Sequence, residues 1–176
     1  MKFEVAIKAI LEAEGGYVND PADSGGKTKF GISDAGDGKK DGKADIDGDG
    51  TGDVKVEALT LEQAKTAYLK RYWHPLNCEP LKDDLLVLHL FDMAVNAGRV
   101  AAVLMLQQLL GVRADGRIGP VTIAAANNFD GSLAERYIDA RIERYKLIAK
   151  KYPKNKKFIK GWLKRVNDIT AYYSAL

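Results

Sequence analysis

Apolar segments with a helical period run through this chain of 176 residues, and most are bounded by residues that start or stop helices. The first segment ends before Gly15-Gly16 and carries its apolar side chains at Phe3, Ile7, Ile10 and Leu11. Residues 15–33 instead have the Gly, Asn, Asp and Ser content of turns, with a short hairpin expected around residues 27–32. Further helices are expected at residues 60–75, 84–97, 100–110, 120–126, 132–152 and 155–173. The pattern predicts a mainly α fold with at most one small sheet near the N-terminus.

The composition excludes several classes of protein. Hydrophobic residues make up 46% and charged residues 29%, as in ordinary folded proteins, so intrinsic disorder is not expected. The single cysteine, Cys78, permits neither an intramolecular disulfide nor a Cys-rich zinc finger, and we expect His89 to be a core histidine rather than a zinc ligand. The longest apolar runs, at residues 85–90 and 100–106, are too short to span a bilayer. Charged residues interrupt the N-terminal segment, so neither a signal peptide nor a transmembrane segment is expected.

Charge is segregated along the chain although the net charge is only +3. Residues 34–57 hold eight acids against four lysines, whereas residues 141–165 hold eleven Lys or Arg against Glu143 alone. The basic terminal helix has one apolar side that suits docking onto the rest of the protein, and its lysines suit an anionic envelope surface. A solvated helix surface is the alternative, and nucleic acid is not an expected partner because no reader motif accompanies the charge.

The acidic segment has the ligand spacing of a calcium-binding loop. Gly50 occupies the turn position, and oxygen ligands fall at positions 1, 3, 5, 7 and 9 as Asp45, Asp47, Asp49, Thr51 and Asp53. Position 12 is Val56, so Glu57 would close the site only with a one-residue bulge, unless another ligand replaces it. A disordered acidic insertion is the alternative, because six glycines lie within these 24 residues. We expect Ca²⁺ here as a structural ion, and no cofactor for chemistry.

Aromatic side chains gather on the helix expected at residues 60–75, at Tyr68, Tyr72 and Trp73. Their faces could stack on sugar rings, but core packing is expected for at least two of them.

Two carboxyls near the N-terminus are expected to have unlike surroundings. Glu14 continues the apolar stripe of the first helix, where a carboxyl has to be paired or to hold its proton. Nine residues later Asp23 lies in a polar, Gly-rich loop, and Thr28 follows five residues beyond; Asp20 is a rival for the hydrated carboxylate. One apolar and one hydrated carboxyl are what a glycosidase uses as its acid and its ionised partner.

The string EGGYVNDPADSGGKTKFGIS, residues 14–33, resembles the signature of glycoside hydrolase family 108, the N-acetylmuramidases of phage endolysins and prophage lysis genes. It is more distantly similar to phage-type lysozymes. The resemblance implies that Glu14 is the catalytic acid and that Asp23 and Thr28 position a water molecule. Such a water would give inversion, whereas direct attack by Asp23 would give retention. Tyr17, Asp20 and Asn96 are the expected substrate-binding residues, although Asn96 could instead cap the turn at Gly98.

Two further stretches extend the resemblance. FDMAVNAG, residues 91–98, looks like the F-D-x-x-x-N-x-G core-helix motif of this family, and LQQLLGVRADGRIGPVTIAAA, residues 106–126, resembles its predicted peptidoglycan-binding segment. The resemblance implies a lysozyme-like α-helical fold with a small β or loop region near the N-terminus. It divides the chain into a catalytic part, residues 1–97, with an acidic insertion at 34–57, and a helical C-terminal part, residues 98–176.

The implied activity is hydrolysis of the β-1,4 bond between N-acetylmuramic acid and N-acetylglucosamine in bacterial peptidoglycan. An endolysin of this kind is expected to be an antimicrobial monomer that waits in the cytoplasm of the host bacterium and then acts on the cell wall. Two alternatives remain open. One is a lytic transglycosylase, which needs only the glutamate, and the other is a non-catalytic, calcium-dependent cell-wall-binding protein.

Overall fold

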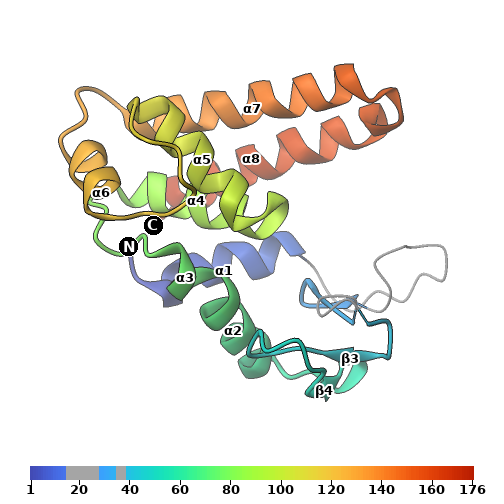
Figure 1. Cartoon of the computed structure of the whole chain (residues 1–176). Helices are drawn as coiled ribbons and strands as arrows, with labels where there is room; N and C mark the ends of the chain where they lie inside the picture. Colours follow the sequence, from blue (N-terminus) through green and yellow to red (C-terminus); the bar gives the residue numbers. More distant parts are fainter. Residues whose placement is uncertain (15–27, 35–38) are drawn as a thin grey trace. The chain divides into compact units, whose positions relative to one another are not determined.

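The computed structural model describes residues 1–14, 28–34 and 39–176 (Figure 1). The chain forms two compact units, one of residues 3–75 and one of residues 1–2 and 76–176. The described ranges are mainly helical and contain two sheets of two strands each, so the predicted mainly α fold is confirmed. None of the helices in these ranges is both long enough and apolar enough to cross a membrane.

The unit of residues 3–75 begins with helix α1 (Phe3–Glu14), which buries Ala6, Ile7, Ala9 and Ile10. Strands β1 (Thr28–Lys29) and β2 (Ile32–Ser33) pair antiparallel as the predicted hairpin, with Lys29 opposite Ile32. The two turn residues, Phe30 and Gly31, both have positive φ, at 53° and 74°. Two such residues make a type I′ turn, whose twist matches that of the paired strands.

A second hairpin shows that the expectation of one sheet was wrong. Strands β3 (Lys43–Ala44) and β4 (Val54–Lys55) pair antiparallel, and acidic residues 45–53 form the loop between them. The one-turn helix η1 (Val56–Ala58) follows β4. Ala44 before this loop and Val56 after it are fully buried, so the chain is anchored in the core on both sides of the loop. Strands of two residues are too short to show an alternating apolar pattern, which is why sequence reasoning missed them.

The next helical segment lies within one residue of its predicted bounds and contains an unpredicted π-helical turn. It consists of α2 (Leu61–Tyr68), the π-helical turn η2 (Leu69–Trp73) and the short α3 (His74–Leu76). The Thr60 hydroxyl accepts from the Gln63 amide, and the Gln63 side chain returns a bond to the Thr60 amide, as a capping box requires. The segment ends at Leu76, and Asn77 then has a φ of 53°, so the predicted stop at Pro75 is confirmed to within one residue.

The unit that includes residues 76–176 has its helices close to the predicted positions. They are α4 (Asp84–Ala97), α5 (Arg99–Leu110), α6 (Pro120–Asn127), α7 (Leu133–Lys151) and α8 (Ile159–Ser174), with the 3-10 turn η3 (Pro153–Phe158) before α8. Gly98 and Gly111 end α4 and α5 with positive φ, and Ser132 caps α7. α4 is the central helix of this unit, with α5, α7 and α8 packed on it (Figure 1).

The apolar side of the basic terminal helix docks onto α7, as expected. Trp162 of α8 stacks on Tyr145 of α7 at a ring-centroid distance of 5.2 Å, and Val166 and Ile169 are buried. The cations of residues 141–165 are not all on the surface, however. Arg141 is fully buried, which the local pattern of charges did not predict.

Candidate active site

Glu14 is the last residue of α1, and its side chain is half-buried. The turn of the β1–β2 hairpin lies directly against it. A methyl group added to Gly31 would lie 2.8 Å from both Cγ and Oε2 of Glu14, and closer still to the hydroxyl of Tyr68. Only glycine fits so tight a space, and its φ of 74° is also one that other residues rarely adopt. Gly31 therefore lets the backbone approach the Glu14 carboxyl.

Tyr68 holds this turn in place. Its side chain is buried on α2, and its hydroxyl donates a hydrogen bond to the Phe30 carbonyl oxygen at 2.9 Å. Of the three aromatic residues on this helical segment, Tyr68 and Trp73 are buried and Tyr72 is half-buried, which confirms core packing for two of them. Sequence reasoning did not connect Tyr68 with Glu14, because 54 positions separate them and only the fold brings both to Gly31.

The other residues predicted for catalysis and substrate binding have different outcomes. Tyr17, Asp20 and Asp23 lie outside the described residues, so their roles stay predictions. Thr28 is half-buried in β1, opposite Ser33. Asn96 is exposed in the last turn of α4, and no described residue hydrogen-bonds to its side-chain amide. The Gly98 amide bonds instead to the Ala94 carbonyl, so the described contacts do not include a cap from Asn96.

Asp34 is a buried carboxylate that sequence reasoning counted only as part of the acidic segment. It follows β2, is 5% exposed, and accepts a hydrogen bond from the Gly42 amide at 3.2 Å. Its second oxygen has no hydrogen-bond partner within the described ranges. The contact with Gly42 ties the β1–β2 hairpin to the segment that leads into β3.

A second buried carboxylate, Asp92 of α4, has both oxygens occupied by arginines. Arg141 of α7 donates to Oδ2 at 2.6 Å, and Arg165 of α8 donates to Oδ1 from Nε at 2.8 Å and lies 2.7 Å from it through Nη2. Asp92 and Arg141 are fully buried. Because charged groups buried in this way must be paired, the network fixes α4, α7 and α8 to one another.

His89 belongs to the same network, which confirms that it is a core histidine. Its Nδ1 lies 2.8 Å from Nη1 of Arg141, so this nitrogen accepts, and Nε2 donates to the Thr170 hydroxyl at 3.1 Å. Burial, with the charge of Arg141 as a smaller cause, lowers the pKa of His89 to about 3. Cys78 is also buried, which raises the pKa of its thiol to about 12. Neither residue is therefore placed to ligate an exposed metal ion.

The acidic loop brings together three of its six predicted metal ligands. Carboxylate oxygens of Asp45, Asp47 and Asp49 lie within 4.8 Å of one another, and Gly50 has a φ of 85°. Asp53 and Glu57 are not part of that cluster; the Asp53 carboxylate accepts from the Ile46 amide at 2.8 Å.

The loop is held by contacts of its own and by the π-helical turn. Asp45 is buried and accepts from the amides of Gly48 at 2.6 Å and Gly50 at 3.1 Å, while its carbonyl accepts from Nη1 of Arg71 at 2.8 Å. The Thr51 amide donates to Asp49 at 2.8 Å. The predicted ligands at positions 1, 3 and 5 are thus close enough for one hard cation, for which carboxylate oxygens are suitable ligands.

Comparison with known proteins connects these features to a family. The protein-family model described as glycosyl hydrolase 108 matches residues 7–98, which include Glu14, Gly31 and Tyr68. The chain belongs to glycoside hydrolase family 108. A second model, described as a predicted peptidoglycan domain, matches residues 101–167. The predicted division at residues 97 and 98 remains a prediction.

The structure of SagA from Brucella abortus is similar to that of this family 108 chain. It is 30% identical, with a TM-score of 0.74, and the match covers 98% of this chain and 94% of that one. No significant match was found among curated proteins. The chain is a glycoside hydrolase that acts on peptidoglycan, as the two matched models and this likeness indicate.

Proposed function

We propose that the protein is a muramidase that hydrolyses the β-1,4 bond between N-acetylmuramic acid and N-acetylglucosamine, with Glu14 as the general acid. The observation that supports this most is the half-buried Glu14 at the end of α1, against which the hairpin turn packs through Gly31. A muramidase has to protonate the glycosidic oxygen that leaves C1 of muramic acid. A carboxyl whose neighbours are held in place and which is partly accessible to solvent suits that step.

A second group has to stabilise or attack the oxocarbenium-like centre at C1. We assign Asp23 and Thr28 to the water on the opposite face of the sugar, which gives inversion. A direct attack by Asp23, or by its rival Asp20, would give retention, and the separation of the two carboxyls distinguishes the courses. Tyr17 and Asn96 are assigned to contacts with the sugars.

The biological role in this proposal is that of a phage-type endolysin. Such an enzyme is made in the cytoplasm of the host bacterium, acts as a monomer on the cell wall and is antimicrobial when added to cells. The basic face of α8 is assigned to the anionic envelope surface. These assignments follow from the family resemblance and the charge of residues 141–165, eleven Lys or Arg against one acid.

We also propose that the loop of residues 45–53 binds Ca²⁺ as a structural ion. The clustered carboxylates of Asp45, Asp47 and Asp49 and the positive φ of Gly50 support this. Asp53 and Glu57, which are not part of that cluster, would have to move or bind through water to contribute, and Thr51 is assigned as a further ligand. The chemistry at Glu14 needs no cofactor in this account.

The proposed function is tested by turbidity loss of purified peptidoglycan and mass spectrometry of the released fragments. The native chain is compared with Glu14→Gln, and Glu12→Gln is the matched control because Glu12 is exposed on the same helix. We expect reducing muramic acid ends from the native chain and from Glu12→Gln, and none above background from Glu14→Gln. Anhydro ends would identify a transglycosylase instead. A native chain that binds peptidoglycan without releasing fragments would identify a wall-binding protein.

A further inference from the structure

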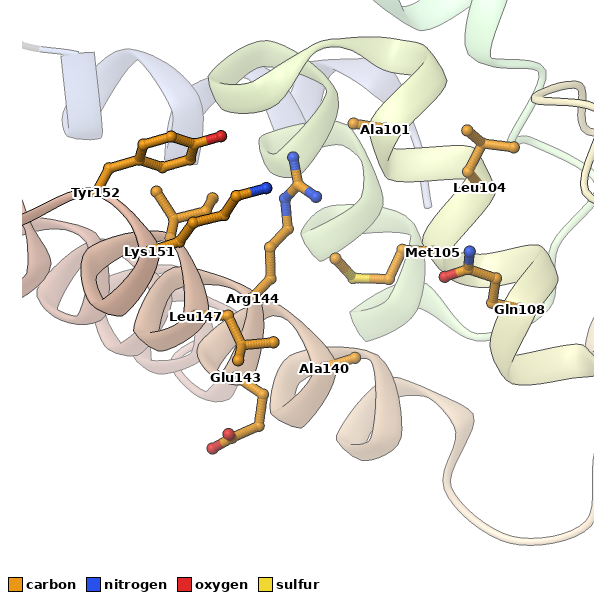
Figure 2. Close-up of a pocket in the computed structure, with 11 residues that line it drawn as sticks. Ala101, Leu104, Met105, Gln108, Ala140, Glu143, Arg144, Leu147, Lys151 and Tyr152 are labelled. Carbon is orange, nitrogen blue, oxygen red and sulfur yellow. The ribbon is translucent and has the colours of Figure 1, made fainter. Parts of the chain in front are cut away.

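A groove of about 580 Å³ lies between α5 and α7, inside the segment that the predicted peptidoglycan domain matches (Figure 2). Its apolar lining includes Leu104 and Met105 of α5 and Leu147 of α7. Leu147 is 62% exposed, and Tyr152 at one end of the groove is 46% exposed. Large apolar side chains left in water along one groove are typical of a binding surface.

Two cations of α7 line the same groove. Arg144 and Lys151 are seven residues apart, which is two helical turns, so they lie on one face of the helix. In Figure 2 both side chains extend into the groove from α7. Neither forms an ion pair with any described residue, and Nε of Arg144 is buried without a hydrogen-bond partner in that set.

The acid among the lining residues does not neutralise these cations. Glu143 pairs with Lys146 at 2.7 Å, and Figure 2 shows its side chain directed away from Arg144. The groove therefore combines an apolar floor with two positive charges that have no acidic partner among the described residues, although the ammonium of Lys151 lies 5.4 Å from the ring centroid of Tyr152. A ligand that complements it carries small apolar groups next to free carboxylates.

Peptidoglycan has this chemistry in its stem peptide and not in its sugars. The peptide carries both alanyl methyl groups and free carboxylates, whereas the lactyl carboxyl of muramic acid is consumed in the amide bond to the peptide. Arginine binds carboxylates through two parallel N–H groups, and lysine binds them as a point charge. An uncharged glycan strand would offer neither cation of the groove a carboxylate partner.

We propose that the α5–α7 groove binds the stem peptide of peptidoglycan, with its carboxylates on Arg144 and Lys151 and its alanyl methyl groups on Leu104, Met105 and Leu147. This inference rests on the proposed function, because it names the part of the same substrate that is held away from the scissile bond. Holding the peptide keeps the glycan strand on the enzyme between cleavages, which raises the effective concentration of the next glycosidic bond at the active site.

The test combines direct binding with hydrolysis on the full-length chain. The binding probe is the tripeptide L-Ala-γ-D-Glu-meso-diaminopimelate, measured by isothermal titration calorimetry. Hydrolysis is measured as reducing ends released from soluble, uncross-linked peptidoglycan strands, with their stem peptides intact or removed by an amidase. The groove variant is Arg144→Gln with Lys151→Gln. The matched control is Lys150→Gln with Lys154→Gln, which removes the same charge from exposed residues that do not line the groove.

We expect the groove variant to bind the tripeptide about tenfold more weakly than the native chain, a loss of about 1.4 kcal/mol, and the control to bind like the native chain. The groove variant should also show a raised KM on peptide-bearing strands only, with kcat unchanged. Circular dichroism melts establish that all variants are folded.

Three outcomes would overturn the inference. The first is a native chain that does not bind the tripeptide, and the second is a groove variant that binds it as tightly as the native chain does. The third is a native dimer that the groove substitutions dissociate, because the groove would then bind a second copy of the chain. A different result would contradict the proposed muramidase function while leaving the groove inference intact. A chain that binds the tripeptide through the groove but releases no reducing ends would contradict only the muramidase activity.

Discussion

Glu14 and Asp92 are both carboxyls on helices, yet their surroundings differ in a way that fits the proposed catalytic role of Glu14 and a structural role for Asp92. Asp92, in the unit of residues 76–176, is fully buried and has both oxygens bonded to arginines. Glu14, in the unit of residues 3–75, is half-buried and lies against a glycine that leaves no room for a side chain. A carboxylate whose oxygens are both occupied holds helices together, whereas one that is partly accessible can exchange a proton with a substrate.

The largest expected effect on stability comes from breaking the Asp92 network. Arg141→Met leaves Asp92 with one cation and should lower the free energy of unfolding by about 3–5 kcal/mol. Lys150→Met is the control, since Lys150 is exposed on the same helix, and should change the free energy by less than about 0.5 kcal/mol. Urea unfolding at pH 7 measures both. A loss below about 1 kcal/mol for Arg141→Met would show that the network is not structural.

A pH titration of stability should show the next largest effect, through His89. Its pKa is about 3 in the folded chain and 6.5 in the unfolded chain, so between these values the unfolded state binds more protons. Stability is therefore lost as the pH falls from about 6.5 towards 3, by up to about 1.4 kcal/mol per pH unit. His89→Gln should flatten this slope in urea unfolding at pH 6, 5 and 4, and His74→Gln should not. Equal slopes for the three proteins would contradict the assignment.

Gly31→Ala tests whether the close packing of the hairpin turn against Glu14 matters for activity. The added methyl group would meet Glu14 and Tyr68, so we expect a destabilisation of about 1–3 kcal/mol and at least a tenfold loss of muramidase activity. Gly42→Ala is the matched control, because Gly42 has a φ of 81° but nothing within 4 Å of an added methyl group. It should cost about 1 kcal/mol for the backbone and leave the activity unchanged. Similar activity for the two variants would contradict the role of close packing at Glu14.

The smallest expected effect is that of calcium on the unit of residues 3–75. At a Ca²⁺ concentration several times the dissociation constant, the stabilisation should be about 1 kcal/mol, or about 2–4 °C in the melting temperature. Asp47→Asn with Asp49→Asn should abolish it, because both carboxylates are exposed members of the cluster. Calorimetric melts with Ca²⁺, Mg²⁺ or chelator measure it. An unchanged melting temperature of the native chain in Ca²⁺ would overturn the calcium proposal.

The sequence predicted those parts of the fold that depend on local chemistry. The capping box at Thr60, the glycine stops at Gly98 and Gly111 and the hairpin around Gly31 all follow from neighbouring residues, and the structure has them. Glu14 could likewise be singled out from residues 14–33 alone, because the family resemblance lies in that continuous string.

The parts that sequence reasoning missed depend on residues far apart in the chain or on elements too short to show a repeating hydrophobic pattern. The pairing of Asp92 with Arg141 and Arg165 spans 49 and 73 positions, so Arg141 looked like one more surface cation. Two-residue strands gave no pattern for the second hairpin, and the π-helical turn at residues 69–73 is not visible in local propensities.

The central claim is that Glu14 carries the chemistry while Asp92 carries the structure. The most direct test measures Glu14→Gln and Asp92→Asn together, by the rate of reducing-end release well below the melting temperature and by the melting temperature itself. The account predicts a rate loss of roughly 10²–10⁴-fold with an almost unchanged melting temperature for Glu14→Gln. For Asp92→Asn it predicts a lowered melting temperature and a rate close to that of the native chain. A Glu14→Gln protein that keeps more than a tenth of the native rate, with the same products, would contradict it.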